Sequence, residues 1–147
     1  MINKKDIKIL RLLKQNSKFT NEEISKKIGI PVTTVHNRIK RLEKLGIIKN
    51  YTVILDNKKL GKEIYAYILI TVDYKILKQK GISQHDLARI LKKYPFVETV
   101  SMITGVSDII MLVSVENIDQ LDELVTTELR NIDGIEKTQT AIVLSSF

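Results

Sequence analysis

Hydrophobic residues recur at helical spacing in three segments near the start of the chain, residues 6–15, 20–28 and 31–45. A recurrence every three or four positions places the hydrophobic side chains on one face of a helix. Thr20 and Glu23 have the spacing of a capping box, which predicts the start of the second helix, and the glycine at position 29 predicts its end. The pattern therefore predicts three helices, the last two forming a helix-turn-helix.

The third helix has a hydrophobic face formed by Val35, Ile39 and Leu42 and a polar face on the other side. Because the hydrophobic stripe must turn inward, the polar side chains are expected to point outward. These are Thr33, Thr34, His36, Asn37, Lys40, Arg41 and Lys44.

The segment after this helix favours β structure. Ile47, Ile48, Tyr51, Val53 and Leu55 lie close together and are followed by a turn-forming Asp-Asn pair. The composition predicts a wing or a linking strand beside the helix-turn-helix.

In residues 64–73 the hydrophobic period changes to two, which predicts a strand with one buried face. A helix capped by Ser83 and ended by Pro95 follows. Further along come strands at 97–104 and 109–115, a helix at 117–134 and a strand at 135–144. This βαββαβ order is typical of a ferredoxin-like sheet with two helices on one face.

The fold class is therefore predicted to be α+β. An N-terminal winged helix-turn-helix domain (residues 1–50) is joined by a linker strand or hinge (51–61) to a C-terminal ferredoxin-like βαββαβ sandwich (62–147). Helices on one side leave the other sheet face open, with Leu69, Ile110 and Leu112 on it. Such a patch predicts a homodimer, in which a second copy covers it.

The charge is divided unevenly along the 147 residues. Residues 1–60 carry 15 Lys and Arg against 5 Asp and Glu, a net of +10, whereas residues 61–147 carry 9 against 12, a net of −3. A basic segment beside a mildly acidic one predicts a polyanionic partner for the first alone.

Composition excludes several classes of protein. The chain has no cysteine, which rules out disulfides, Cys-ligated zinc and thiol catalysis. The first residues lack the apolar core of a signal peptide, and no apolar run approaches the roughly 20 residues that span a bilayer. We expect a cytoplasmic protein with no membrane partner.

The outward face of the third helix has the chemistry of a DNA reader. Short polar side chains near its start can approach base edges, Asn can pair with adenine, and Lys or Arg further along can meet phosphates. A solvated basic face on an ordinary amphipathic helix is the alternative. The candidate DNA-binding residues are Thr33, Thr34, His36, Asn37, Arg38, Lys40, Arg41 and Lys44.

The stretch RIKRLEKLGII (residues 38–48) and three C-terminal motifs resemble the Lrp/AsnC (feast/famine) transcription regulators. The C-terminal motifs are TGVSDII (104–110), GI (134–135) and TQTAIVL (138–144). In order and spacing the resemblance covers essentially the whole chain.

The resemblance implies a sequence-specific DNA-binding transcriptional regulator. It implies that the C-terminal domain forms dimers and often octamers, that the linker adds to the dimer contact, and that a small effector such as an amino acid binds between dimers. The transcription machinery is a further expected partner. The effector-binding residues carried over from the family are Thr99, Ser101, Gly105, Ser107 and Asp108.

Two positions depart from the family pattern. Pro31 replaces a serine that caps the recognition helix, which leaves the cap to Thr33 or leaves the helix start uncapped. Ser107 replaces an aromatic residue before Asp108. For Gly105 and Asp108 the alternative to effector binding is a tight turn between strands.

Two other functions compete with DNA binding. The sirohaem decarboxylases share this two-domain layout, but here the regulatory half offers only His85, Arg89 and Arg130 for such chemistry. The helix-turn-helix could instead contact protein. His36 and His85 lie in different halves, so neither a metal site nor a catalytic site nor a cofactor is predicted.

Overall fold

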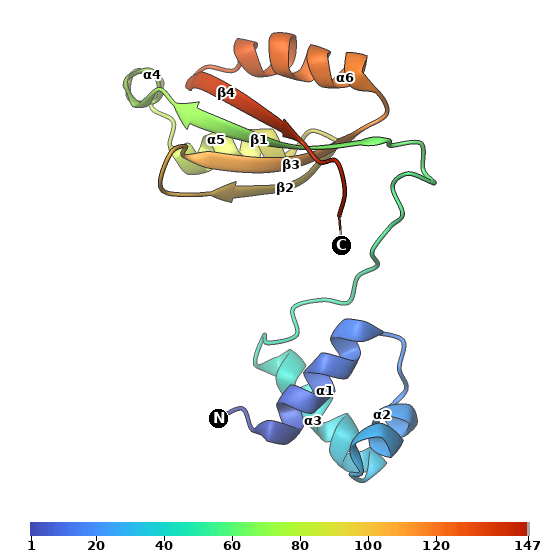
Figure 1. Cartoon of the computed structure of the whole chain (residues 1–147). Coiled ribbons are helices and arrows are strands. Elements are labelled where there is room, and N and C mark those ends of the chain that lie inside the picture. Colours follow the sequence, from blue (N-terminus) through green and yellow to red (C-terminus); the bar gives the residue numbers. More distant parts are fainter. Residues whose placement is uncertain (147) are drawn as a thin grey trace. The chain divides into compact units, whose positions relative to one another are not determined.

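The computed structural model describes residues 1–146, and the chain divides into two compact units, Met1–Leu55 and Asp56–Phe147 (Figure 1). The predicted linker, residues 51–61, is shared between them. Its first five residues belong to the helical unit and the rest to the unit that contains the sheet.

The first unit consists of three helices in the predicted order, α1 (Lys4–Gln15), α2 (Asn21–Ile28) and α3 (Val32–Lys44). Capping boxes begin α1 and α2, and Gly29, with φ +68°, ends α2 in the left-handed conformation. The core of the unit is formed by Ile9, Ile24 and Val35, one residue from each helix. This three-way contact positions α3 against the other two helices.

The segment predicted as a wing or linking strand forms no ladder. In the described chain before residue 64 there is no strand, and residues 49–56 are irregular. A β-favouring sequence needs a neighbouring strand to supply backbone hydrogen bonds, and a single copy of the chain offers none here.

The second unit is built on a four-stranded antiparallel sheet of order β2-β3-β1-β4. The strands are β1 (Ile64–Val72), β2 (Val97–Met102), β3 (Ile109–Val115) and β4 (Ile135–Ile142). The helices are α4 (Tyr74–Lys80), α5 (Gln84–Lys92) and α6 (Ile118–Glu123), the last continued by a π-helical turn (Leu124–Glu128) and a 3-10 turn (Leu129–Asn131). No helix within residues 1–146 is long and apolar enough to cross a bilayer.

Helix α4 is an addition to the predicted βαββαβ order. The Asp73 side chain caps it by accepting hydrogen bonds from the backbone N–H groups of Lys75 and Ile76, and Gly81 ends it in the left-handed conformation. Both signals are present in the sequence, but seven residues are too short for a helical period to stand out.

The alternation predicted for β1 is confirmed. Ala66, Ile68 and Ile70 are fully buried in a core that includes Leu87 of α5 and Leu121 of α6, so both helices cover the same sheet face. The intervening side chains therefore lie on the opposite, open face. The strand register makes neighbours of Tyr67 and Leu112, and likewise of Leu69 and Ile110.

We expect Gly134→Ala to destabilise the sheet-containing unit by about 1–3 kcal/mol. Gly134 has φ +94°, and an added Cβ would collide with Leu77, whose Cγ would lie only 3.0 Å away. Leu77 is itself buried and has little room to move. Denaturant unfolding monitored by circular dichroism measures the loss.

Gly81→Ala is the matched control. Its φ of +66° is also left-handed, but no atom lies within 4 Å of the added Cβ. It should therefore show the conformational penalty without the collision. Equal losses in the two variants would contradict a packing role for Gly134.

Candidate nucleic-acid interface

No side chain caps the start of helix α3. Pro31 occupies the N-cap position with φ −56° and ψ 143°, and no side-chain cap hydrogen bond forms. Thr33 therefore does not take over the cap, and its side chain is exposed. Of the two alternatives left by the proline, the structure has the uncapped start.

One continuous stripe of α3 faces solvent. Thr33, Asn37, Lys40 and Lys44 are all exposed and recur at i, i+4, i+7 and i+11, the spacing of one helix face. The opposite face holds Val35, which is fully buried. Short polar side chains, of the kind that can approach base edges, thus form one continuous surface with lysines, which can meet phosphates.

His36 and Thr34 lie on opposite flanks of this stripe, because two successive helical steps rotate a side chain by about 200°, and His36 is on the flank nearer to α2. The Nδ1 atom of His36 is 3.3 Å from the side-chain nitrogen of Asn21, the first residue of α2. His36 is exposed, whereas Thr34 is half-buried. These two residues border the stripe and do not lie on it.

Arg38 is directed toward α1. One guanidinium nitrogen donates to Asp6 Oδ1 at 2.7 Å and to Asn3 Oδ1 at 3.1 Å, and the side chain is only 22% exposed. Although Arg38 is a candidate DNA-binding residue by sequence, its charged group is bound within the helical unit.

Arg41 occupies an intermediate position. It donates to the backbone carbonyl of Met1 at 3.0 Å and lies 3.8 Å from Asp6 Oδ2, yet 44% of its side chain remains exposed. Lys40 and Lys44 have no salt bridge among the described residues. The cations of α3 therefore differ in how freely they can reach a ligand.

Asp6 is the buried centre of this arrangement, with 0% of its side chain exposed. Burial raises the pKa of its carboxyl group, but this is outweighed by the hydrogen bonds from the Asn3 backbone and Arg38 and by the charges of Arg38 and Arg41, so the pKa is lowered overall. Asp6 thus remains ionised between two arginines of the recognition helix.

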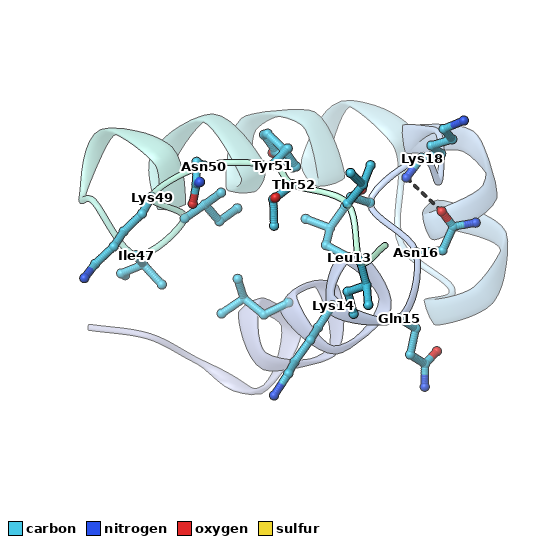
Figure 2. Close-up of a pocket in the computed structure, with 15 residues that line it drawn as sticks. Leu13, Lys14, Gln15, Asn16, Lys18, Ile47, Lys49, Asn50, Tyr51 and Thr52 are labelled. Atoms are coloured by element: carbon cyan, nitrogen blue, oxygen red, sulfur yellow. Dashed lines mark hydrogen bonds between the residues drawn. The ribbon is translucent and has the colours of Figure 1, made fainter. Parts of the chain in front are cut away.

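An apolar pocket lies in the same unit, between the end of α1 and residues 47–54 (Figure 2). Leu13 and Ile47 are among the side chains that line it. Tyr51 donates a hydrogen bond to Glu43 Oε1 at 2.7 Å, and burial together with this bond raises the pKa of Tyr51 to about 12. This hydrogen bond connects the segment that contains Tyr51 to helix α3, which contains Glu43.

The five effector candidates fall in two places in the sheet-containing unit. Thr99 and Ser101 are exposed on β2, where they pair with Leu112 and Ile110 and so share the open sheet face. Gly105, with φ +133°, lies in the loop between β2 and β3. Ser107 and Asp108 follow it, Ser107 being buried.

Asp108 joins this loop to the end of β1. Its Oδ2 accepts from the backbone N–H of Val72 at 2.8 Å and its Oδ1 from the Tyr74 hydroxyl at 2.8 Å, while Gln84 donates to its carbonyl at 3.0 Å. The bond to Asp108 raises the pKa of Tyr74. Tyr74 was missed because the helix on which it lies, α4, was not predicted. Gln84 begins the predicted helix α5, but no sequence signal indicates its contact with Asp108.

The chain matches two family models in succession. Residues 2–49 match a winged helix-turn-helix DNA-binding domain, and residues 65–147 match the Lrp/AsnC ligand binding domain, which alone covers more than half of the chain. The chain belongs to the Lrp/AsnC family of HTH-type transcriptional regulators. The resemblance in sequence and the predicted fold class are thereby confirmed.

Lrp/AsnC relatives match over nearly the full length. The HTH-type transcriptional regulators PH0140 of Pyrococcus horikoshii and FL11 of Pyrococcus furiosus are each 35% identical, over 95% of this chain and 84% and 87% of theirs. Among solved structures, AsnC of E. coli has a TM-score of 0.82 at 27% identity, with 99% of this chain and 94% of that one covered. The Neisseria meningitidis regulator NMB0573, solved as an L-Met complex, has a TM-score of 0.88 at 25% identity, covering 99% and 91%.

The three residues that could serve the chemistry of a sirohaem decarboxylase, which acts on a tetrapyrrole, do not lie at one site. His85 and Arg89 line a shallow groove between α5 and β2, whereas Arg130 lies on the 3-10 turn that follows α6. Within residues 1–146 no cluster of three His, Cys, Asp or Glu could hold a metal ion.

We expect Arg38→Gln to raise the pKa of Asp6 toward its ordinary value of 3.8. The variant removes a hydrogen bond and a positive charge that lower this pKa, whereas burial, which raises it, remains. The carboxyl carbon resonance of Asp6, followed by NMR across pH, measures the change. Arg89→Gln is the matched control, because the pKa of Asp86 is lowered mainly by hydrogen bonds from Ser83 and should move little.

The stability of the helical unit should follow the same titration. Because the pKa of Asp6 is lower in the folded state, its stabilising contribution is complete above the ordinary pKa of 3.8 and is lost as pH falls through the lowered value. In Arg38→Gln this loss below pH 4 should shrink. An unaltered Asp6 titration in the variant would show that the ion pair is not formed in solution.

Proposed function

We propose that this Lrp/AsnC regulator reads duplex DNA by placing the first turns of α3 in the major groove. The observation that supports the proposal most strongly is the exposed stripe of Thr33, Asn37, Lys40 and Lys44, which lies opposite the buried Val35. The second helix of a helix-turn-helix presents its N-terminal residues to base edges. The uncapped start of α3 leaves Thr33 free to do so.

Different residues of α3 would have different tasks. Thr33, Thr34, His36 and Asn37 would face base edges, where an Asn amide can pair with two atoms of adenine. Lys40, Arg41 and Lys44 would meet phosphates and fix the register without reading sequence. The net charge of +9 on Met1–Leu55, from 13 Lys and Arg against 4 Asp and Glu, would add attraction for any duplex.

We expect Asn37→Ala and Lys40→Gln to weaken DNA binding in different ways. Asn37→Ala should lower affinity for the selected operator by about 1–3 kcal/mol and leave random DNA nearly unaffected. Lys40→Gln should weaken both about equally and make the plot of log affinity against log salt shallower by about 0.9. The operator is first obtained by selection from random duplexes, and fluorescence anisotropy at several salt concentrations measures both effects.

Lys75→Gln serves as the control for charge, because Lys75 is exposed on α4 in the other unit. It should change neither the discrimination nor the salt slope by a comparable amount. Equal losses on operator and random DNA in Asn37→Ala would argue against placing Asn37 in the groove.

The same proposal includes a homodimer formed across the open sheet face. Two helices cover one face only, and Leu69, Ile110 and Leu112 are neighbours on the other. Val53 and Ile54, beside the apolar pocket of the helical unit, are 70% and 99% exposed and would be covered by the same assembly. A dimer would present two α3 helices to two half-sites, and dimers could associate further into octamers.

We expect Leu112→Glu to convert the dimer to a monomer. A carboxylate at the centre of an apolar interface would be buried without a partner. Sedimentation equilibrium measures the mass. Thr140→Glu is the matched control, because Thr140 is exposed on β4 and pairs with the buried Ile68, which places it on the opposite side of the sheet. If Leu112→Glu kept the wild-type mass, the interface would lie elsewhere.

The proposal further assigns a small effector, such as an amino acid, to Thr99, Ser101, Gly105, Ser107 and Asp108. It is supported by the match of residues 65–147 to a ligand binding domain and by the L-Met complex of the Neisseria meningitidis relative. Binding there would regulate DNA occupancy in the cytoplasm and thereby the access of the transcription machinery.

A further inference from the structure

A buried ion pair between Asp6 and Arg38 sets one cation of α3 apart from the others. Four cationic residues lie on α3, namely Arg38, Lys40, Arg41 and Lys44. The two lysines project from the exposed stripe, whereas both arginines are directed to α1. The difference follows from Asp6, since both arginines approach its carboxylate.

Arg38 is held more firmly than Arg41. It has a 2.7 Å contact with Asp6 Oδ1 and a second acceptor in Asn3 Oδ1, and its Nε is buried with no hydrogen-bond partner. A buried N–H group without a hydrogen-bond partner lowers the stability of the fold. The contact with the Asp6 carboxylate must therefore offset this loss to keep the Arg38 side chain in its position. Arg41 lies 3.8 Å from Asp6 and keeps nearly half of its side chain in solvent.

We propose that Asp6 is a positioning residue that withholds Arg38 from DNA and thereby limits sequence-independent binding by α3. This inference rests on the proposed DNA-binding function and deepens it. Every phosphate contact adds affinity for operator and random DNA alike. A cation retained on α1 therefore increases the ratio of specific to non-specific affinity without altering the residues that face the bases.

The test compares Arg38→Gln with Lys40→Gln, which remove the same charge from the same helix. Binding of random-sequence duplex is measured by anisotropy over a range of salt concentrations. Lys40→Gln should make the salt slope shallower by about 0.9, the value for one phosphate contact. Arg38→Gln should leave the slope unchanged, because Arg38 meets no phosphate in the wild type.

Asp6→Asn should have the opposite effect and release Arg38. The asparagine oxygen can still accept the hydrogen bond of the Asn3 backbone, so the capping role at the start of α1 is retained. Without the negative charge, Arg38 is free to reach a phosphate. The salt slope should become steeper by about 0.9, and random DNA should bind roughly fivefold to tenfold more tightly at 0.1 M salt.

Glu23→Gln is the matched control for the change in net charge. Glu23 occupies the same capping-box position in α2, within the same unit, and forms no salt bridge among the described residues. The proposal requires a steeper slope in Asp6→Asn than in Glu23→Gln. The double variant Asp6→Asn, Arg38→Gln should return to the wild-type slope. It leaves no unpaired buried charge, so it can still be measured if either single variant is unstable.

Each outcome decides between the alternatives. A shallower slope in Arg38→Gln, or an unchanged slope in folded Asp6→Asn, overturns the proposal while DNA binding by α3 stands. If Asp6 had only a structural role, Asp6→Asn would lower the thermal stability but leave the salt slope of DNA binding unchanged. That result would also overturn the proposal. If the wild type binds no duplex at all, the proposed function fails together with this inference.

Discussion

The burial of one face of α3 is the constraint on which the helical unit depends. Val35 packs with Ile9 and Ile24, and because a helix turns by 3.6 residues, this contact determines which side chains face outward. Asn37 and Lys40 are exposed because they lie on the side of α3 opposite to the buried Val35. Their exposure does not depend on whether their own side chains are polar. The surface proposed to face DNA is therefore a consequence of packing inside a three-helix core.

The same one-sided burial shapes the sheet-containing unit. Helices α5 and α6 share the face formed by Ala66, Ile68 and Ile70, so the alternating side chains are left on the other face. Antiparallel sheets tolerate one solvated face, but here Leu69 and Leu112 make it partly apolar. The proposed assembly that covers this face would join two copies of the chain and therefore two copies of α3. In the proposed function, the homodimer and the reading of DNA would both follow from the burial of only one face of each element.

Period and capping signals were sufficient to predict the long elements from sequence, and they failed where another interaction decides the outcome. The stripe of α3 and the alternation of β1 follow directly from residue spacing. Helix α4 was missed because seven residues show little period. Residues 47–55 have the composition of a strand but no partner to pair with. The contact of Arg38 with Asp6 could not be predicted, because the two residues lie 32 positions apart in sequence and a long side chain can reach back to another helix.

Asp6 connects these observations to the balance between affinity and specificity. A unit with a net charge of +9 attracts any duplex, and each additional phosphate contact strengthens operator and random sites equally. Selectivity therefore requires that some cations be held away from DNA. The lysines on the exposed stripe point away from Asp6 and cannot be held by it. An arginine on the side that faces α1 can reach an internal carboxylate, and its guanidinium group has several donors for such a contact. The lysines of α3 lie on its exposed stripe, whereas Arg38 lies on the side that faces α1, where one buried carboxylate is sufficient to hold it.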